Sequence, residues 1–267
     1  MEQEELSMIN QEGWDQAVYQ AWINRHGHPI EYAKKVKENP EKAISHYLKY
    51  MGDVKGKKIA NFLGSKGSKA VAFALLGADV TVVDISKENR KYAIELAKEA
   101  NVNIHYIVSD VLNIPAEQTL KEFDYVLLEN GVLHYFIDLH ALFKVVSKTL
   151  KSGGSLILRD YHPFVSKIIN VNKGQLSANG NYFDKGLMDV DVAYSSLINE
   201  KDRSSLKKIK IRKWNMGEVV TSIAKTGLHI TSLEEEEGNR WVFPKESPKE
   251  IENRMPGLYT LTAKKID

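Results

Sequence analysis

The fold is decided by two neighbouring stretches, KIANFLGSKGS at positions 58–68 and LGADVTVVDIS at positions 76–86. In the first stretch a short apolar run ends in glycine and serine, just before a segment with helical periodicity. In the second stretch an apolar run ends in an acid. Alternation of short apolar runs with helix-period segments predicts a mainly parallel sheet that helices cover on both faces.

The same alternation continues along the chain and predicts five parallel strands with helices between most of them. We expect the strands at Lys58–Leu63, Asp79–Val83, Asn103–Val108, Phe123–Leu128 and Ser155–Leu158, and the helices near 68–76, 87–100 and 139–150. A turn at Ser152-Gly153-Gly154 is expected to stop the last of these helices, because a left-handed C-terminal position favours glycine.

The C-terminal part begins with an interruption at residues 161–213, which we interpret as an insertion that caps the substrate site. After it, Asn215 and Glu218 have the spacing of a capping box and predict a helix over 216–225. Two further strands, His229–Leu233 and Tyr259–Ala263, predict a closing hairpin with a long connection. The four glutamates at 234–237 are expected to form a solvated strand end.

Residues 1–52 form a helical leader ahead of the first strand, and residues 53–267 form the main domain. The leader carries Trp14, Tyr19 and Trp22, whose large side chains are costly to leave in water. Ordinary core packing is one explanation for these aromatic residues. The other is that residues 10–26 form a mobile lid over a binding crevice.

Composition narrows the class of protein. The 267 residues contain 37 Lys plus Arg against 35 Asp plus Glu, so the formal charge of +2 provides no large cationic field and nucleic acid is not an expected partner. An acidic N-terminus and the lack of an apolar run of about 18 residues predict a cytoplasmic protein without a membrane partner. There is no cysteine, and His26 and His28 have no nearby carboxylate, so no metal site is predicted.

Polar residues follow four consecutive expected strands. The loop from Gly64 to Gly67, which includes Ser65 and Lys66, lies between a strand and a helix, where glycine lets a ligand approach the backbone. Its G-x-x-G spacing is weak evidence alone. Acids follow the next three strands, and because the carboxyl ends of parallel strands meet at one edge, we expect one ligand crevice there. The residues expected at this edge are Asp84, Ile85, Ser86, Asp110, Val111, Glu129 and Asn130.

On these residues the sequence resembles the class I S-adenosylmethionine (SAM)-dependent methyltransferases. The resemblance rests on IANFLGSKG at 59–67, LGADVTVVDIS at 76–86, Asp110, GVLHYF at 131–136, LKSGGSL at 150–156 and the segment 214–227. It covers about residues 50–267 and implies a doubly wound, Rossmann-like α/β fold whose seven-stranded sheet has an antiparallel last strand. It also implies SAM as the cofactor, with the methionine end at Gly64, the ribose at Asp84 and the adenine near Asp110.

The glycine loop departs from the family pattern D-x-G-x-G-x-G. Phe62 stands at the position of the acid, and Lys66 and Ser68 replace the second and third glycines. If the family pattern is shifted by one residue along the chain, Asn61 falls at the position of the acid and Gly67 at that of the last glycine. This shift would compensate for the replacements. Lys66 brings a cation to a site for a sulfonium ligand, and an alternative is that it pairs with the cofactor's carboxylate.

Methyl transfer requires aligned reactants and, for a hydroxyl or amine acceptor, removal of a proton. Histidine is the natural base near neutral pH, and His134 and His162 follow the fourth and fifth strands. Alternatively, His134 caps the next helix or contacts the cofactor, and His162 holds the insertion in place. The aromatic residues expected to contact the substrate are Trp14, Tyr19, Trp22, Tyr161 and Trp214.

The sequence therefore predicts a small-molecule O- or N-methyltransferase that works as a monomer or homodimer. One alternative is a non-catalytic SAM-binding protein, which the degenerate glycine loop favours. Another is an NAD(P)-dependent oxidoreductase, because such enzymes share the strand, loop, helix and strand-two acid. The missing third glycine of the dinucleotide fingerprint argues against an oxidoreductase.

Overall fold

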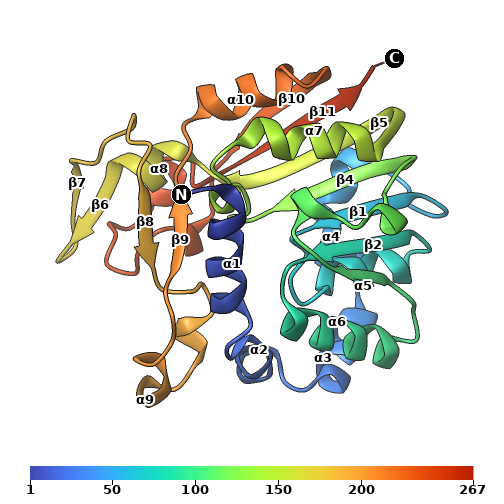
Figure 1. Ribbon diagram of the computed structural model, residues 1–267. Helices are drawn as coiled ribbons and strands as arrows, with labels where there is room; N and C mark the ends of the chain where they lie inside the picture. Colours follow the sequence, from blue (N-terminus) through green and yellow to red (C-terminus); the bar gives the residue numbers. More distant parts are fainter. Residues whose placement is uncertain (267) are drawn as a thin grey trace.

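A seven-stranded sheet forms the centre of the computed structural model, which describes residues 1–266 (Figure 1). The strand order is β10-β11-β5-β4-β1-β2-β3. The strands are β1 Lys58–Phe62, β2 Asp79–Asp84, β3 His105–Val108, β4 Phe123–Glu129, β5 Leu150–Tyr161, β10 Leu228–Glu236 and β11 Leu258–Lys265.

The last strand runs against the others. β11 pairs antiparallel with both β10 and β5, whereas β1, β2, β3, β4 and β5 pair in parallel. A hairpin between β10 and β11 reverses the chain, while each of the earlier strands returns through a crossover. The predicted doubly wound, Rossmann-like α/β fold with a seven-stranded sheet and an antiparallel last strand is confirmed.

Helices cover both faces of the sheet (Figure 1). On one face, apolar residues of α2 to α6 pack against Ile59, Val82 and Leu127; on the other, those of α7 and α10 pack against Phe62 and Leu128. These strand residues alternate between the two faces, as the side chains of a strand must. The helices are α1 Gln3–Trp14, α2 Val18–His26, α3 Pro29–Glu38, α4 Pro40–Met51, α5 Ser68–Leu75, α6 Lys87–Ala100, α7 Leu139–Thr149 and α10 Met216–Ala224.

Side-chain hydrogen bonds define the first residues of two helices, α6 and α10. The Ser86 side chain accepts a hydrogen bond from the backbone N–H of Asn89 at the start of α6. At the start of α10, Asn215 and Glu218 form both bonds of the predicted capping box. Such bonds satisfy backbone N–H groups that have no partner within a helix.

Two sequence-based expectations were wrong in detail. Gly153 is left-handed, with φ of 73°, but it lies within β5 at a shift in the pairing with β4, so the expected turn is an irregularity of the strand. The glutamates at 234–237 are not simply a solvated strand end. Glu236 forms a bidentate ion pair with Arg159, and Glu234 and Glu235 pair with Lys49 and His162.

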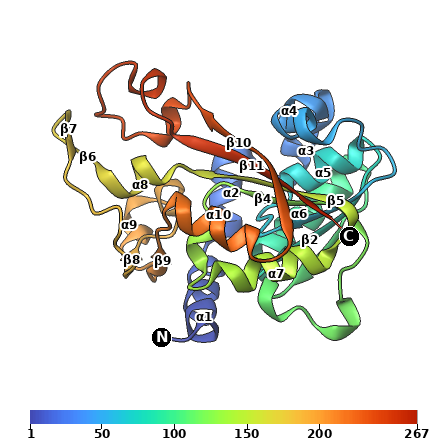
Figure 2. The same ribbon diagram turned by 90° about the horizontal axis from the view of Figure 1, so that it is seen from above.

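The interruption at 161–213 folds into two small antiparallel hairpins beside the sheet. Figure 2 shows that these hairpins and the connection between β10 and β11 project from the same end of the sheet. α1 lies between the insertion and the sheet (Figure 1). None of the helices within residues 1–266 is long and apolar enough to cross a membrane. The insertion contains α8 Pro163–Ile168, β6 Ile169–Asn172, β7 Gln175–Ala178, β8 Leu187–Val190, α9 Glu200–Arg203 and β9 Ile209–Arg212.

Candidate active site

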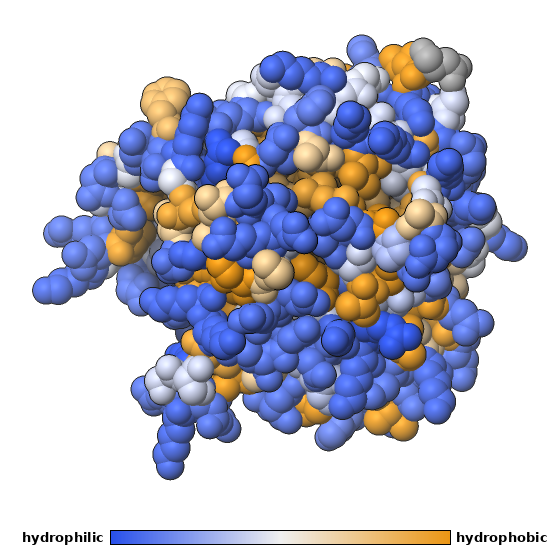
Figure 3. Space-filling model, viewed as in Figure 1, coloured by the Kyte–Doolittle hydropathy of each residue, from blue (hydrophilic) through white to orange (hydrophobic). Residues whose placement is uncertain are grey.

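A cavity of about 510 Å³ opens at the carboxyl ends of β1, β2, β3 and β4, within the usual range for small-molecule sites. Apolar residues gather in the middle of this face of the molecule, between the insertion and the sheet (Figure 3). The cavity brings together many of the residues predicted from the sequence. These are Trp14, Trp22, Gly64, Ser65, Lys66, Asp84, Ile85, Asp110, Val111, Glu129, Asn130, His134 and Tyr161.

The loop after β1 has an unusual backbone. Leu63, Ser65 and Gly67 have φ values of 51°, 50° and 70°, so every second residue is left-handed although only one of the three is glycine. This alternation fits the one-residue shift of the glycine pattern. A side chain at Gly64 would lie 2.7 Å from the Asn61 amide oxygen, so packing beneath the loop excludes one. Left-handed leucine and serine carry backbone strain, which is typical of ligand-binding loops.

Asp84 ends β2 and organises the loop around it. Its carboxylate accepts hydrogen bonds from the backbone N–H groups of Ser65 and Ser86, both at 2.9 Å, and from the Asn89 amide at 3.2 Å. Burial raises the pKa of Asp84, and these hydrogen bonds oppose that rise. Three bonds leave acceptor capacity on a carboxylate, which offers about four lone-pair sites.

Asp110 has an acceptor atom without a partner. Its Oδ1 accepts a hydrogen bond from the backbone N–H of Leu112 at 2.9 Å, whereas its Oδ2 is buried and has no hydrogen-bond partner within residues 1–266. A buried oxygen left unpaired is costly, so a donor from a ligand fits this position.

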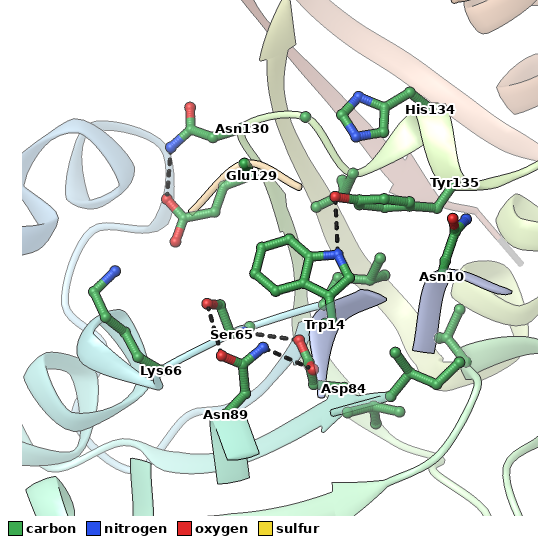
Figure 4. A pocket seen from close by; sticks show the side chains of 18 of the residues that line it. Asn10, Trp14, Ser65, Lys66, Asp84, Asn89, Glu129, Asn130, His134 and Tyr135 are labelled. Atoms are coloured by element: carbon green, nitrogen blue, oxygen red, sulfur yellow. Dashed lines mark hydrogen bonds between the residues drawn. The ribbon is translucent and has the colours of Figure 1, made fainter. Parts of the chain in front are cut away.

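Lys66 and Glu129 lie on one side of the cavity, with the Trp14 side chain in the middle (Figure 4). Burial lowers the pKa of Lys66 to about 8, and the Glu129 carboxylate opposes this shift. Glu129 in turn accepts hydrogen bonds from the Tyr47 hydroxyl and the Asn130 amide. This side of the cavity therefore presents one cation and one anion.

His134 and Tyr135 lie on the opposite side (Figure 4). Burial lowers the pKa of His134 to about 4, and the nearby Lys213 ammonium lowers it further, so the imidazole is neutral at pH 7. The Tyr135 hydroxyl accepts a hydrogen bond from the Trp14 indole at 3.1 Å. This leaves the Tyr135 proton available to a ligand oxygen.

Asp160 positions the segment that carries these two residues. Its buried carboxylate accepts hydrogen bonds from the backbone N–H groups of Gly131 at 2.6 Å and Leu133 at 3.2 Å. Asn130 and Gly131, just before His134, are both left-handed, which turns these N–H groups toward the carboxylate.

Three predicted site residues lie elsewhere. His162 is outside the cavity: its Nδ1 accepts from the backbone N–H of Phe164, and its Nε2 lies 2.8 Å from Glu235, so it holds the start of α8 and is not positioned as a base. Tyr19 donates to Glu95 on α6. Trp214 donates to the carbonyl of Leu133 behind the cavity wall. The structure therefore does not place His162, Tyr19 or Trp214, which were predicted as site residues, in the cavity that gathers the other predicted residues.

Gly67 and Ser86 support the cavity without lining it. Gly67 is the left-handed residue before α5, packed against Ala93, and Ser86 caps α6. The sequence analysis also missed several lining residues. Ser7, Asn10, Tyr32 and Ala193 come from α1, α3 and the insertion, which no local motif connects to the crevice. The others, which lie beside predicted residues of the crevice loops, are Ser68, Lys69, Asn89, Tyr135 and Phe136.

Side-chain amides attach α1 to its surroundings. Gln3 both donates to the carbonyl of Tyr135 and accepts from the N–H of Ile137. Asn10 makes the same reciprocal pair with the backbone of Lys210 on β9. At the other end of the helix, Gln11 donates to the carbonyl of Ile85 beside Asp84. α1 thus contacts the end of β2, the His134 segment and the insertion together.

Comparison with known proteins places this architecture among methyltransferases. Residues 63–158 match the family model described as a methyltransferase domain. A curated relative, the ubiquinone biosynthesis O-methyltransferase of Xanthomonas oryzae pv. oryzae, is 31% identical over 112 residues, which are 42% of this chain and 46% of the relative. The chain thus spans about half the length of the curated relatives it matches.

Solved structures share the fold at low sequence identity. A SAM-dependent methyltransferase from Mesorhizobium loti has a TM-score of 0.62 and 20% identity, covering 83% of this chain and 97% of its own. The magnesium protoporphyrin IX methyltransferase of Synechocystis PCC 6803, solved with bound S-adenosylhomocysteine (SAH), has a TM-score of 0.58 and 14% identity, covering 97% and 99%.

Proposed function

Because this chain carries a class I SAM-dependent methyltransferase domain, we propose that it transfers the methyl group of SAM to an oxygen or nitrogen atom of a small-molecule acceptor. The observation that carries the proposal is the single cavity that joins the strand-end acids to His134 and Tyr135. The curated relative's name, an O-methyltransferase, supports an oxygen acceptor.

The residues of the cavity fit the cofactor. The unpaired, buried Oδ2 of Asp110 would accept from the adenine amine, and Asp84 has acceptor capacity left for the ribose hydroxyls. Lys66 and Glu129 offer opposite charges at the side where an amino-acid group would lie. The loop that contains Ser65 lets a ligand approach the backbone.

When bound, SAM supplies an electrophilic methyl group that is displaced directly from sulfur. The protein's part is to align the acceptor, exclude water and accept a proton. His134 is neutral at pH 7 and lines the cavity, so it can accept the proton of a hydroxyl acceptor. Tyr135 would orient the same oxygen through its hydroxyl.

The wall around His134 also indicates the kind of acceptor. Its lining side chains are aromatic, small or uncharged polar groups, which suit an uncharged, ring-containing molecule better than an ion. A phenolic hydroxyl would satisfy both the wall and a weakly basic imidazole, because phenols release a proton far more readily than aliphatic alcohols. The residues of this wall are Ser7, Asn10, His134, Tyr135, Phe136, Tyr161 and Ala193.

We propose further that α1 is the mobile part of the predicted lid. Its contacts to backbone groups on three sides would let it release and re-form while the sheet stays intact. α2 belongs to the fixed part, because its Val18, Ala21 and Trp22 pack in the main core. The formal charge of +2 and the small-molecule cavity support a protein that acts without nucleic acid, and we propose that it works in the cytoplasm as a monomer or homodimer.

The test is transfer of an isotopically labelled methyl group from SAM to a panel of small molecules that carry phenolic, aliphatic hydroxyl or amino groups. We expect labelled product with phenols. Transfer to none of the panel, with SAM bound, would support the alternative of a non-catalytic SAM-binding protein. Stabilisation by NAD but not by SAM would support the oxidoreductase alternative.

A further inference from the structure

The side chain of Lys66 is fixed by the aromatic ring of Trp22. The ammonium nitrogen lies 4.5 Å from the centroid of that ring, a cation–π contact. The ring is itself anchored, because the Trp22 indole donates to Asn89 at 2.9 Å, and Asn89 donates to Asp84. α2 therefore holds Lys66 against the wall of the cavity.

This cation has no anionic partner in the part of the chain that the structure describes. Within residues 1–266, no carboxylate lies within 4.0 Å of its nitrogen and no hydrogen bond from it is found. Its pKa is lowered to about 8 by burial, despite the opposing Glu129 charge. A partly buried ammonium without an anionic partner is unfavourable, and an anion brought by a ligand would remove that cost.

The neighbouring lysine provides a contrast. Lys69 also lines the cavity, but its ammonium donates to the carbonyl of Ala43 at 2.6 Å and lies 5.8 Å from the Tyr47 ring centroid. Its charge is already engaged by α4. Of these two lysines, Lys66 is the one that is free to receive a ligand.

Glu129 complements Lys66 across this side of the cavity (Figure 4). Its Oε2 accepts from the Tyr47 hydroxyl and the Asn130 amide, whereas no partner is found for its Oε1 within residues 1–266. A cation and an anion that face the same space without pairing with each other match an α-amino acid, which carries a carboxylate and an ammonium on one carbon.

We propose that Lys66, which replaces a glycine of the family's loop, is the receptor for the α-carboxylate of the bound cofactor, with Glu129 as the partner of its α-ammonium. This proposal rests on the proposed function, because it assigns one end of the SAM site. It implies that the protein distinguishes the full cofactor and its product from adenosine thioethers that lack the amino-acid group.

Two ligands test the proposal by calorimetry, without turnover. SAH carries the amino-acid group, and 5′-methylthioadenosine carries the adenosine and thioether without it. Lys66→Met should weaken SAH binding by roughly ten- to a hundredfold, the effect of losing one charge-assisted bond, while leaving methylthioadenosine binding unchanged. Lys66→Arg should restore part of the SAH affinity, and Lys69→Met is the matched control with an unchanged ratio.

The outcomes separate the two proposals. If the wild type binds neither ligand, the proposed function fails. If the wild type binds both and Lys66→Met leaves the ratio of their affinities unchanged, the assignment of Lys66 alone is overturned. If Lys66→Met weakens both ligands equally, Lys66 shapes the loop and does not receive the carboxylate, which also overturns the assignment.

The pH dependence gives a second readout. The free Lys66 has a pKa of about 8, and the titratable groups that interact with it are Arg25 and His26 on α2, Lys69 on α5 and Glu129 on β4. Carboxylate binding favours its charged form, so the SAH-to-methylthioadenosine affinity ratio should fall as pH rises above about 8. The α-ammonium of SAH titrates equally in the wild type and in Lys66→Met, so a steeper fall in the wild type isolates Lys66. Equal slopes would contradict the proposal.

Discussion

The two halves of the cavity are built in different ways. In the cofactor half, Asp84 and Asp110 end or follow adjacent strands and bind backbone N–H groups a few residues away in their own loops. In the proposed acceptor half, α1 and the His134 segment come from distant parts of the chain, and the amides of Gln3 and Asn10 join α1 to that segment and to β9, which follows it in the sequence. The cofactor half is thus part of the sheet, whereas the acceptor half is an assembly of separable parts.

This difference predicts which changes affect which property. Changes in the cofactor half should weaken SAM and SAH binding, since the proposed function assigns the acids to those ligands. Changes in the acceptor half should reduce turnover while the sheet and the cofactor half persist. The five predictions below test this division, from the largest expected effect to the smallest.

Removal of residues 1–16 should abolish turnover. It deletes α1 and its contacts to Ile137, Ile85 and Lys210, but keeps α2, whose residues belong to the core. The far-ultraviolet circular dichroism spectrum should retain the signal of a folded α/β domain, and SAH binding should weaken but persist. Global unfolding of the truncated protein would show instead that α1 is a core element.

His134→Ala should lower turnover by roughly a hundred- to ten-thousandfold, the usual contribution of a general base, with SAH affinity unchanged. His140, an exposed histidine on α7, provides the control substitution. If His134→Ala leaves turnover intact, another group removes the proton.

The acid limb of the wild-type pH–rate profile tests the same assignment. Because burial lowers the pKa of His134 to about 4, the imidazole stays unprotonated as pH falls from 7 to 5. Protonation of His134 should therefore limit turnover only near pH 4. A midpoint near 6.5 in a nuclear magnetic resonance titration of the His134 ring would contradict the buried, neutral imidazole.

Asp84→Ala should weaken SAH binding by about 1.5–3 kcal/mol for each charge-assisted bond lost to the ligand. The substitution also removes the acceptor for Ser65 and Asn89, so the loop after β1 should become less ordered. Asp79→Ala, at the exposed beginning of the same strand, is the matched control and should bind SAH normally. Calorimetry that gives equal affinities for both variants would refute the ribose assignment.

Asp110→Asn should have the smallest effect, about 1 kcal/mol, since one acceptor oxygen becomes a donor while size is kept. The loss should be specific for adenine: S-inosylhomocysteine, which has a carbonyl in place of the amine, should not lose affinity. A variant that binds both ligands normally but melts much earlier would mean that Asp110 is structural.

The same division explains what could be predicted from the sequence. The strand-end acids could be found because the edge of a parallel sheet gathers residues whose positions follow from local periodicity. The contacts of α1 could not, because Asn10 and Lys210 meet only after the insertion folds. The position of His162 shows the same limit: it directly follows β5, but its Nε2 lies 2.8 Å from Glu235 on β10 and it does not line the cavity.

Cofactor binding by the purified protein tests the central claim most directly. Thermal unfolding should be compared with SAM, SAH and NAD, each at about a hundredfold its dissociation constant or at the highest soluble concentration. SAM and SAH should each add about 2.7 kcal/mol of stability, and NAD should add none. Stabilisation by NAD alone, or by none of the three, would contradict the assignment of this cavity to SAM.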